Sequence, residues 1–251
     1  MPGGLRRTSA GAALGLVLLV TACVPASPNS TSPDGTTTDS ATPPASPSPA
    51  PAASTPAPED PPPGWTTFTT TSGDLAFDYP AGWTVKDPGG ALTGDFVDVL
   101  NPEGTLVAGL RTNIVTGSEC RDKSPYEVYD AEPMLALAEA GGADGGVPRY
   151  VFESRGADTG TVATQSTIAA FGITMFPEES GDTACPMFHL FLWPPSGAFF
   201  GGTYNPESNQ TPGDPSLPYL EKARLYASTP EYRDVRTMIT SLRPAGEAAD
   251  K

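Results

Sequence analysis

The side chains with the most distinctive chemistry in this 251-residue chain are three cysteines and one histidine: Cys23, Cys120, Cys185 and His189. A thiol can be acylated or oxidised, and an imidazole can act as a general base. No cysteine lies in a C-x-x-C pair and no serine in a G-x-S-x-G turn, which argues against redox and serine-hydrolase sites. Two of the cysteines and one histidine are too few for a zinc site. We therefore predict no cofactor and no metal.

His189 lies in an apolar stretch, and an extended strand there would place it on one face with Met187, Phe191 and Trp193. We interpret it as a core histidine whose ring nitrogens bond to the backbone. A catalytic triad would need it as general base, but no matching nucleophile pattern is present.

Paired carboxylates are the remaining source of acid–base chemistry, since glycoside hydrolysis needs two of them about 5–9 Å apart. Asp95 with Asp98 and Glu178 with Glu179 are candidate pairs, but all four lie in or near expected turns, where we expect water to surround them. The glycine-rich stretch 141–146 lacks the lysine and helix of a phosphate-binding loop, so we interpret it as an ordinary loop.

Aromatic side chains gather near the C-terminal part of the chain, at Trp193, Phe199, Phe200 and Tyr204. An exposed group of this kind could stack on a sugar or a peptide. Ordinary core packing is the alternative, and we favour it. If the fold exposes a binding surface, we expect it here.

The N-terminal segment indicates that Cys23 is a site of acylation. Arg6 and Arg7 precede an apolar run that is too short to span a bilayer, as in a secretory signal peptide. Val20-Thr21-Ala22-Cys23 then resembles the lipobox of bacterial lipoproteins, which implies cleavage before Cys23 and its acylation, palmitate included. We expect a lipid-anchored protein on the outer face of the cytoplasmic membrane, projecting into the cell wall. The general secretory and twin-arginine routes both stay open, as does an ordinary signal peptide.

Lipidation of Cys23 leaves Cys120 and Cys185, an even number of thiols in an oxidising compartment. We predict that they form a disulfide bond. Two free buried thiols are the alternative.

Composition divides the chain into four segments. Residues 1–22 are the signal peptide, and residues 23–63 carry the lipidated cysteine and a tether of Pro, Ser and Thr. Such a tether has too little apolar surface to offset its ordering entropy, so we predict disorder. Residues 64–244 hold all three tryptophans and are long enough for one buried core. Residues 245–251 are expected to form a disordered tail.

The formal net charge is −15, and no group of lysines and arginines forms a basic stripe. This excludes nucleic acid as an expected partner, because a phosphate backbone needs a concentrated positive face. An anionic membrane would also repel the chain, so the acyl chains must provide the attachment.

Apolar alternation predicts a β-rich middle and helices towards the end. The turn Pro80-Ala81-Gly82 is expected to join two hairpin arms, and Ser228-Thr229-Pro230-Glu231 predicts a helix start. The expected strands are 66–71, 75–79, 83–86, 96–100, 106–115, 150–154, 187–193 and 198–204, and the stretch 161–176 is expected to form one long strand or a hairpin. The expected helices are 217–226, 132–140 and the one that starts near Thr229 and stops before Pro244.

Both ends of the folded part resemble a known family. The stretch 67–85, with Ser72-Gly73, Phe77, Tyr79-Pro80 and Gly82-Trp83, is similar to the opening of PsbP-like (LpqN-like) domains, and the last helix is similar to theirs. The resemblance implies an α+β fold, an antiparallel sheet with helices packed on its faces (an α/β/α sandwich). It also implies that Trp83 is buried near Val235 and Ile239 of the last helix. Members of this family are mostly accessory or binding proteins.

Three functions follow from these observations. The leading one is a non-catalytic accessory or binding lipoprotein with an unknown protein or cell-wall partner, and it is not an enzyme. The alternatives are a cell-wall glycan hydrolase with paired carboxylates and a structural surface protein without a small ligand. Two carboxylates with raised pKa values in a deep cleft would favour the hydrolase.

Overall fold

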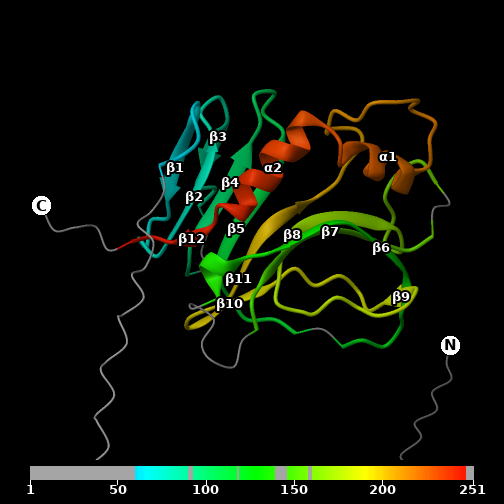
Figure 1. Cartoon of the computed structure of the whole chain (residues 1–251), viewed down its shortest axis with the longest axis horizontal. Coiled ribbons are helices and arrows are strands. Elements are labelled where there is room, and N and C mark those ends of the chain that lie inside the picture. Colours follow the sequence, from blue (N-terminus) through cyan, green and yellow to red (C-terminus); the bar gives the residue numbers. More distant parts are fainter. Residues whose placement is uncertain (1–59, 90–92, 118, 139–145, 158–159, 247–251) are drawn as a thin grey trace, which may run out of the picture. The chain divides into compact units, whose positions relative to one another are not determined.

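The computed structural model describes residues 60–89, 93–117, 119–138, 146–157 and 160–246 (Figure 1). These residues belong to one compact unit, Thr55–Lys251. The predictions for the signal peptide, for Cys23, for nearly all of the tether, for most of the stretch 141–146 and for residues 247–251 lie outside the described residues.

Strands dominate the described residues, of which 39% are strand and 13% are helix. The predicted α+β sandwich with helices packed on the faces of the sheet is therefore wrong, and the fold is β-rich. One reason is the stretch 132–140, where β6 (Ser124–Pro133) ends and only a short 3-10 helix, Leu135–Leu137, follows. The amide of Met134 donates to the carbonyl of Pro148, just ahead of β7 (Arg149–Arg155). At the position where a helix was expected, the backbone thus bonds to a distant segment and not to a preceding helical turn.

Nine strands form the large sheet, in the order β3-β4-β5-β11-β8-β7-β6-β9, with β10 paired to the end of β11. All pairs are antiparallel. The bounds are β3 Thr84–Lys86, β4 Phe96–Leu100, β5 Leu106–Ile114, β7 Arg149–Arg155, β8 Ile168–Thr174, β9 Thr183–Ala184, β10 Phe191–Trp193 and β11 Ser196–Thr203.

A second, three-stranded sheet has the order β1-β2-β12, with β1 Trp65–Thr69, β2 Leu75–Pro80 and β12 Arg243–Pro244. The predicted hairpin between 75–79 and 83–86 is wrong, because β2 pairs with β1 and β12, whereas β3 pairs with β4. The turn itself forms, since the Trp83 amide donates to the Pro80 carbonyl. It passes the chain from one sheet to the other.

The two helices are α1, Tyr219–Tyr226, and α2, Pro230–Thr240. The signals predicted for α2 operate as expected: the Thr229 hydroxyl accepts from the amide of Tyr232 at 3.1 Å, and Pro230 occupies the first turn. Figure 1 shows α2 lying across the large sheet beside the small one. Its Ser241 cap hydroxyl also accepts from the amide of Asp78 on β2, which fixes α2 against that strand.

An aromatic core fills the space between the helices and the large sheet. Phe152 of β7 packs with its ring centroid 6.3 Å from that of Tyr226 on α1 and 5.1 Å from that of Tyr232 on α2. Both helices therefore cover one and the same face. Trp83 is buried, as expected from the sequence, with only 9% of its surface exposed. It belongs to the same large core cluster as Val235 and Ile239.

Candidate functional site

Strand β7 carries opposite chemistry on its two faces. Tyr150 and Phe152 point towards the helices, and because side chains alternate along a strand, Arg149, Glu153 and Arg155 point the other way. Burial of charged groups is costly unless they are paired. The second face of the sheet therefore needs partners for these groups.

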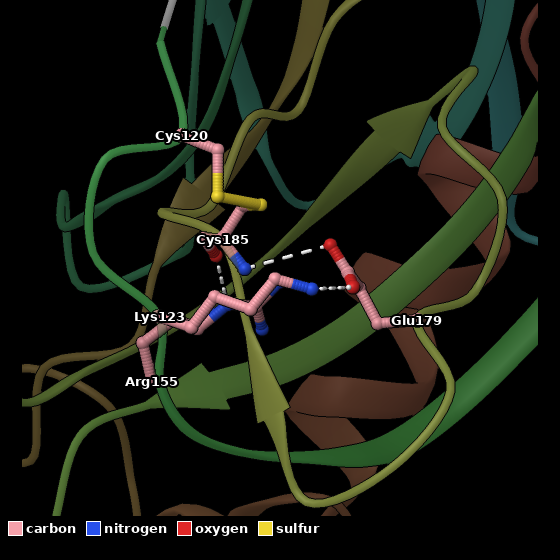
Figure 2. The surroundings of a disulfide bond; sticks show 5 residues. All are labelled: Cys120, Lys123, Arg155, Glu179 and Cys185. Atoms are coloured by element: carbon pink, nitrogen blue, oxygen red, sulfur yellow. Dashed lines mark hydrogen bonds and ion pairs between the residues drawn. A yellow bond between two sulfur atoms is a disulfide. The ribbon is translucent and has the colours of Figure 1, made fainter.

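The partners come from a long loop between β8 and β10, which runs along the side of the sheet opposite the helices (Figure 1). Cys185 of this loop forms a disulfide bond with Cys120, just ahead of β6, with a Cα–Cα distance of 5.3 Å. That distance lies inside the range expected for a disulfide. Glu179, also in the loop, forms an ion pair with Lys123 at 2.9 Å (Figure 2).

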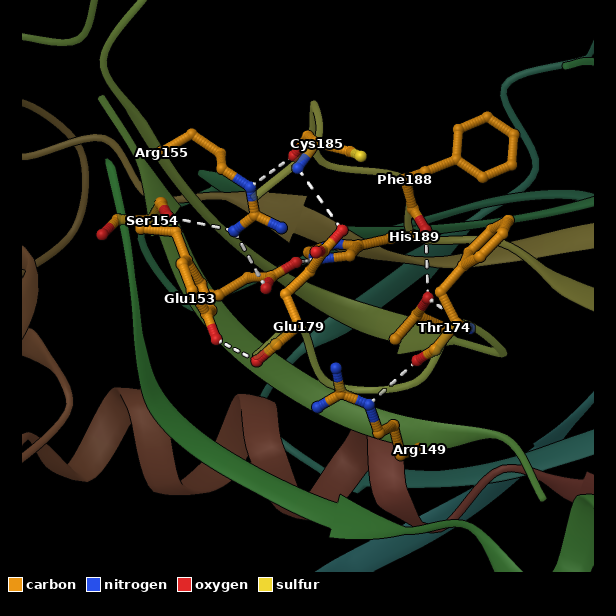
Figure 3. Close-up of polar contacts among 11 residues, drawn as sticks. Arg149, Glu153, Ser154, Arg155, Thr174, Glu179, Cys185, Phe188 and His189 are labelled. Atoms are coloured by element: carbon orange, nitrogen blue, oxygen red, sulfur yellow. Dashed lines mark hydrogen bonds and ion pairs between the residues drawn. The ribbon is translucent and has the colours of Figure 1, made fainter. Parts of the chain in front are cut away.

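Arg155 joins the disulfide to the sheet. Its Nε donates to the Cys185 carbonyl at 2.7 Å, and its Nη1 donates to Glu153 at 3.0 Å (Figure 3). The other carboxylate oxygen of Glu153 lies 3.0 Å from Nε2 of His189. The loop is thus tied to β7 through one chain of charged contacts that ends at a buried histidine.

His189 departs from its predicted setting. It is buried as expected, but it precedes β10 and does not lie in a strand. Its partner is the carboxylate of Glu153, not the backbone. A glycine at position 172 of β8 makes room for the ring, because a Cβ there would come within 3.0 Å of His189 Nδ1.

A cavity of about 170 Å³ lies beneath the loop. Its wall mixes aromatic rings, prolines, both halves of the disulfide and charged groups from the sheet. The lining residues are Cys120, Tyr126, Arg149, Glu153, Arg155, Thr174, Phe176, Pro177, Glu179, Cys185, Pro186 and Phe188. We call this cavity the disulfide pocket.

Both carboxylates of the disulfide pocket are tuned towards the charged form. Burial alone would raise the pKa of Glu153, but the hydrogen bond and charge of His189, together with Arg155, outweigh it and lower the pKa below its ordinary value. The hydrogen bond from Lys123 lowers the pKa of Glu179 in the same direction. Neither group has the raised pKa that a general acid requires.

The four aromatics named as a possible binding surface do not share one surface. Phe200 and Tyr204 are fully buried, and the Phe200 ring centroid lies 4.9 Å from that of Phe77. Trp193 and Phe199 are half-buried. Because Phe199 and Phe200 alternate across β11, a stacking platform of all four cannot form.

A wider groove of about 820 Å³ lies on the β5–β11 part of the large sheet. Phe199 lines it, together with the glycines at 109, 201 and 202, and Leu106 and Val162 are exposed beside it. One predicted aromatic thus borders an open groove.

The four carboxylates of the candidate pairs lie in different settings. Asp95 is buried and accepts from the hydroxyl and amide of Ser72, so the expectation that water surrounds it is wrong. Asp98 forms an ion pair with Arg111. Of Glu178 and Glu179, only the second lines the disulfide pocket.

Within the described residues, no group of three or more His, Cys, Asp or Glu side chains is placed to hold a metal ion. In the same part of the chain, no helix combines the length and apolar character needed to cross a bilayer.

Arg149, Glu153 and Arg155 were missed from the sequence as site residues. A signal was present: three charged residues share one face of a strand whose other face, with Tyr150 and Phe152, is apolar. Charged groups on a central strand mark a face that something polar must cover. The sequence did not show that the cover would be a loop from beyond β8.

Comparison with protein-family models, curated proteins and solved structures found no match for this chain.

Proposed function

We propose that this protein is a lipid-anchored extracytoplasmic lipoprotein that acts as a non-catalytic binding or accessory module, with the disulfide pocket as its ligand site. One observation carries the proposal: each oxygen of Glu153 is held by a partner inside the protein, one by His189 and the other by Arg155. A carboxylate whose two oxygens are both bonded inside the protein has a structural role in the pocket wall and is not free to donate a proton to a substrate.

Two further points support a binding role. The pocket is part apolar and part charged, as ligand sites commonly are. The lowered pKa values of Glu153 and Glu179 disfavour the alternative of a glycan hydrolase, in which one carboxylate must stay protonated. Acylation of Cys23 would place the site outside the cytoplasmic membrane.

Anchoring is tested on the full chain made in a bacterial host that processes lipoproteins. Mass spectrometry should find a mature protein that begins at acylated Cys23, and Cys23→Ser should be released or left unprocessed. A mature protein that begins beyond Cys23 without acyl groups would overturn the anchor.

Catalysis is tested by incubating the purified protein with wall glycans, peptides and esters. We expect no turnover above that of a heat-unfolded sample. Turnover that disappears in Glu153→Gln or Glu179→Gln, while Glu178→Gln retains it, would establish the hydrolase and refute the binding role. Glu178 is the matched control because it is the exposed neighbour outside the pocket wall.

A further inference from the structure

Arg149 is the charge in the disulfide pocket that lacks an acidic partner. Glu153 pairs with Arg155, and Glu179 pairs with Lys123. Among the described residues, no ion pair involves Arg149. The wall itself carries two arginines and two glutamates. Because Lys123, outside the wall, pairs with Glu179, the charge of Arg149 is left unpaired on a chain whose net charge is −15, and an unpaired positive charge in a partly closed site attracts anions.

Of the guanidinium nitrogens of Arg149, only Nε has a hydrogen-bond partner among the described residues. Its Nε donates to the carbonyl of Phe176 at 3.1 Å, which fixes the plane of the guanidinium group. Nη1 is buried without a hydrogen-bond partner, and within the described part of the chain Nη2 has none either (Figure 3). Buried N–H groups without acceptors are rare and call for an explanation such as a ligand.

A second guanidinium group, that of Arg155, also supports a ligand that accepts hydrogen bonds in this pocket. The side chain of Arg155 is only 10% exposed. Its Nε and Nη1 bind Cys185, Glu153 and Ser154, whereas Nη2 has no acceptor among the residues that the structure describes. Arg149 and Arg155 therefore present N–H groups without acceptors from the same face of β7.

The pocket wall also has an apolar part, and the pocket is of limited size. The rings of Phe176 and Phe188 meet edge-on with centroids 5.5 Å apart, and Pro177 and Pro186 lie beside them in the wall. The volume of about 170 Å³ is close to that of apolar protein cavities that accept a benzene-sized molecule. One ring-sized group fits, and a polymer chain does not.

We propose that the disulfide pocket binds a small organic carboxylate with a single ring-sized apolar body. The carboxylate accepts from Nη2 of Arg149, because a hydrogen bond from a charged donor to a carboxylate is of the stronger kind. The apolar body packs against Phe176 and Phe188. The inference rests on the proposed binding function and adds the class of ligand.

The test uses the purified full chain in detergent, with benzoate, benzamide, benzylamine and inorganic phosphate as probes in calorimetric titrations. Benzoate should bind at least about tenfold more tightly than benzamide, since hydrogen bonds to an ionised group are the stronger kind. Benzylamine should bind more weakly still. Phosphate, which lacks an apolar body, should not compete with benzoate at equal concentration.

Variants separate the charge from the apolar contacts. Arg149→Gln should weaken benzoate binding about tenfold or more and leave benzamide binding unchanged. Phe176→Ala should weaken both probes by a similar factor. The control is Arg233→Gln, which removes the same charge from an exposed position on α2, and it should change neither affinity.

Equal affinities for benzoate and benzamide, or a loss of benzoate binding in Arg233→Gln as large as in Arg149→Gln, would overturn the carboxylate assignment. Binding of phosphate in place of benzoate would also overturn it. The same holds if no probe binds to a protein that is shown to be folded by its unchanged unfolding temperature. Turnover that depends on Glu153 would instead overturn the binding function. The two failures are therefore distinct.

Discussion

The two faces of the large sheet differ in what holds their covering layers. On one face, helices α1 and α2 are held by packed aromatic rings such as those of Phe152, Tyr226 and Tyr232. On the other, a loop is held by a disulfide and by the charged contacts of Arg155 and Glu153. A single strand, β7, serves both. The comparison teaches that covalent and ionic ties can hold a loop against a sheet where no helix supplies a packed aromatic face.

The first prediction concerns the aromatic face. Phe152→Ala should lower the free energy of unfolding by about 3–5 kcal/mol, because a fully buried ring leaves a cavity. Phe176→Ala on the loop side should cost far less, because that ring is 51% exposed. Urea unfolding followed by circular dichroism measures both variants. Equal losses would show that the two faces are packed alike.

The second prediction concerns the covalent tie. The disulfide closes a separation of 65 residues, so its reduction should cost about 4 kcal/mol in the chain-entropy picture. The double variant Cys120→Ser with Cys185→Ser should reproduce the effect of reductant and no longer respond to it. Thermal unfolding with and without reductant is the measurement. A reductant effect that persists in the double variant would assign it to something other than this bond.

The third prediction tests the space reserved for His189. Gly172→Ala would place a methyl group 3.0 Å from His189 Nδ1 and from the Phe200 carbonyl, which should cost about 1–3 kcal/mol through overpacking. The matched control is Gly82→Ala, where a Cβ meets no atom within 4 Å. Proton NMR of the single histidine should show a changed environment in the first variant only. An unchanged signal in Gly172→Ala would show that the ring does not lie there.

The fourth prediction separates the faces by pH. Burial raises the pKa of Tyr219 to about 12 from 10.0. The native state therefore keeps a proton that the unfolded chain releases, and stability should fall as the pH rises from about 10 to 12. Glu153 behaves oppositely. Its pKa is lowered from 4.5, so its contribution is present above about pH 4.5 and is lost as the pH falls through the lowered value.

Unfolding in urea across a pH series measures both ends of this dependence. Tyr219→Phe should flatten the alkaline limb, and Glu153→Gln should flatten the acid limb. A Tyr219→Phe protein whose acid limb changes instead would contradict the assignment of each limb to one face.

The success of prediction from sequence followed the range of the interactions. The start of α2 was predictable because Thr229 and Pro230 act within one turn. The disulfide partners could be chosen because only two thiols remained after Cys23. The partner of β2 was not predictable, since the choice between β3 and the distant β12 depends on tertiary packing that a local pattern does not contain.

The pocket was the least predictable part. His189 and Glu153 are 36 positions apart, and nothing in either neighbourhood specifies the other. Strand β6 was missed altogether because its side chains are mostly half-buried and polar, so the apolar alternation that marks a strand is weak there. Both failures arise where charge pairing, and not apolar burial, organises the structure.

The small sheet has a mechanical consequence. Strand β1 begins opposite Pro80, and β12 ends opposite Leu75, so the chain enters at one end of β2 and leaves at the other. A load applied between the segment before β1 and the segment after β12 therefore runs along the strands in shear, and the hydrogen bonds of each pairing carry it together rather than being peeled in turn. The two-residue pairing of β12 is the shorter of the two. Under tension, the sheet should release its last strand before its first.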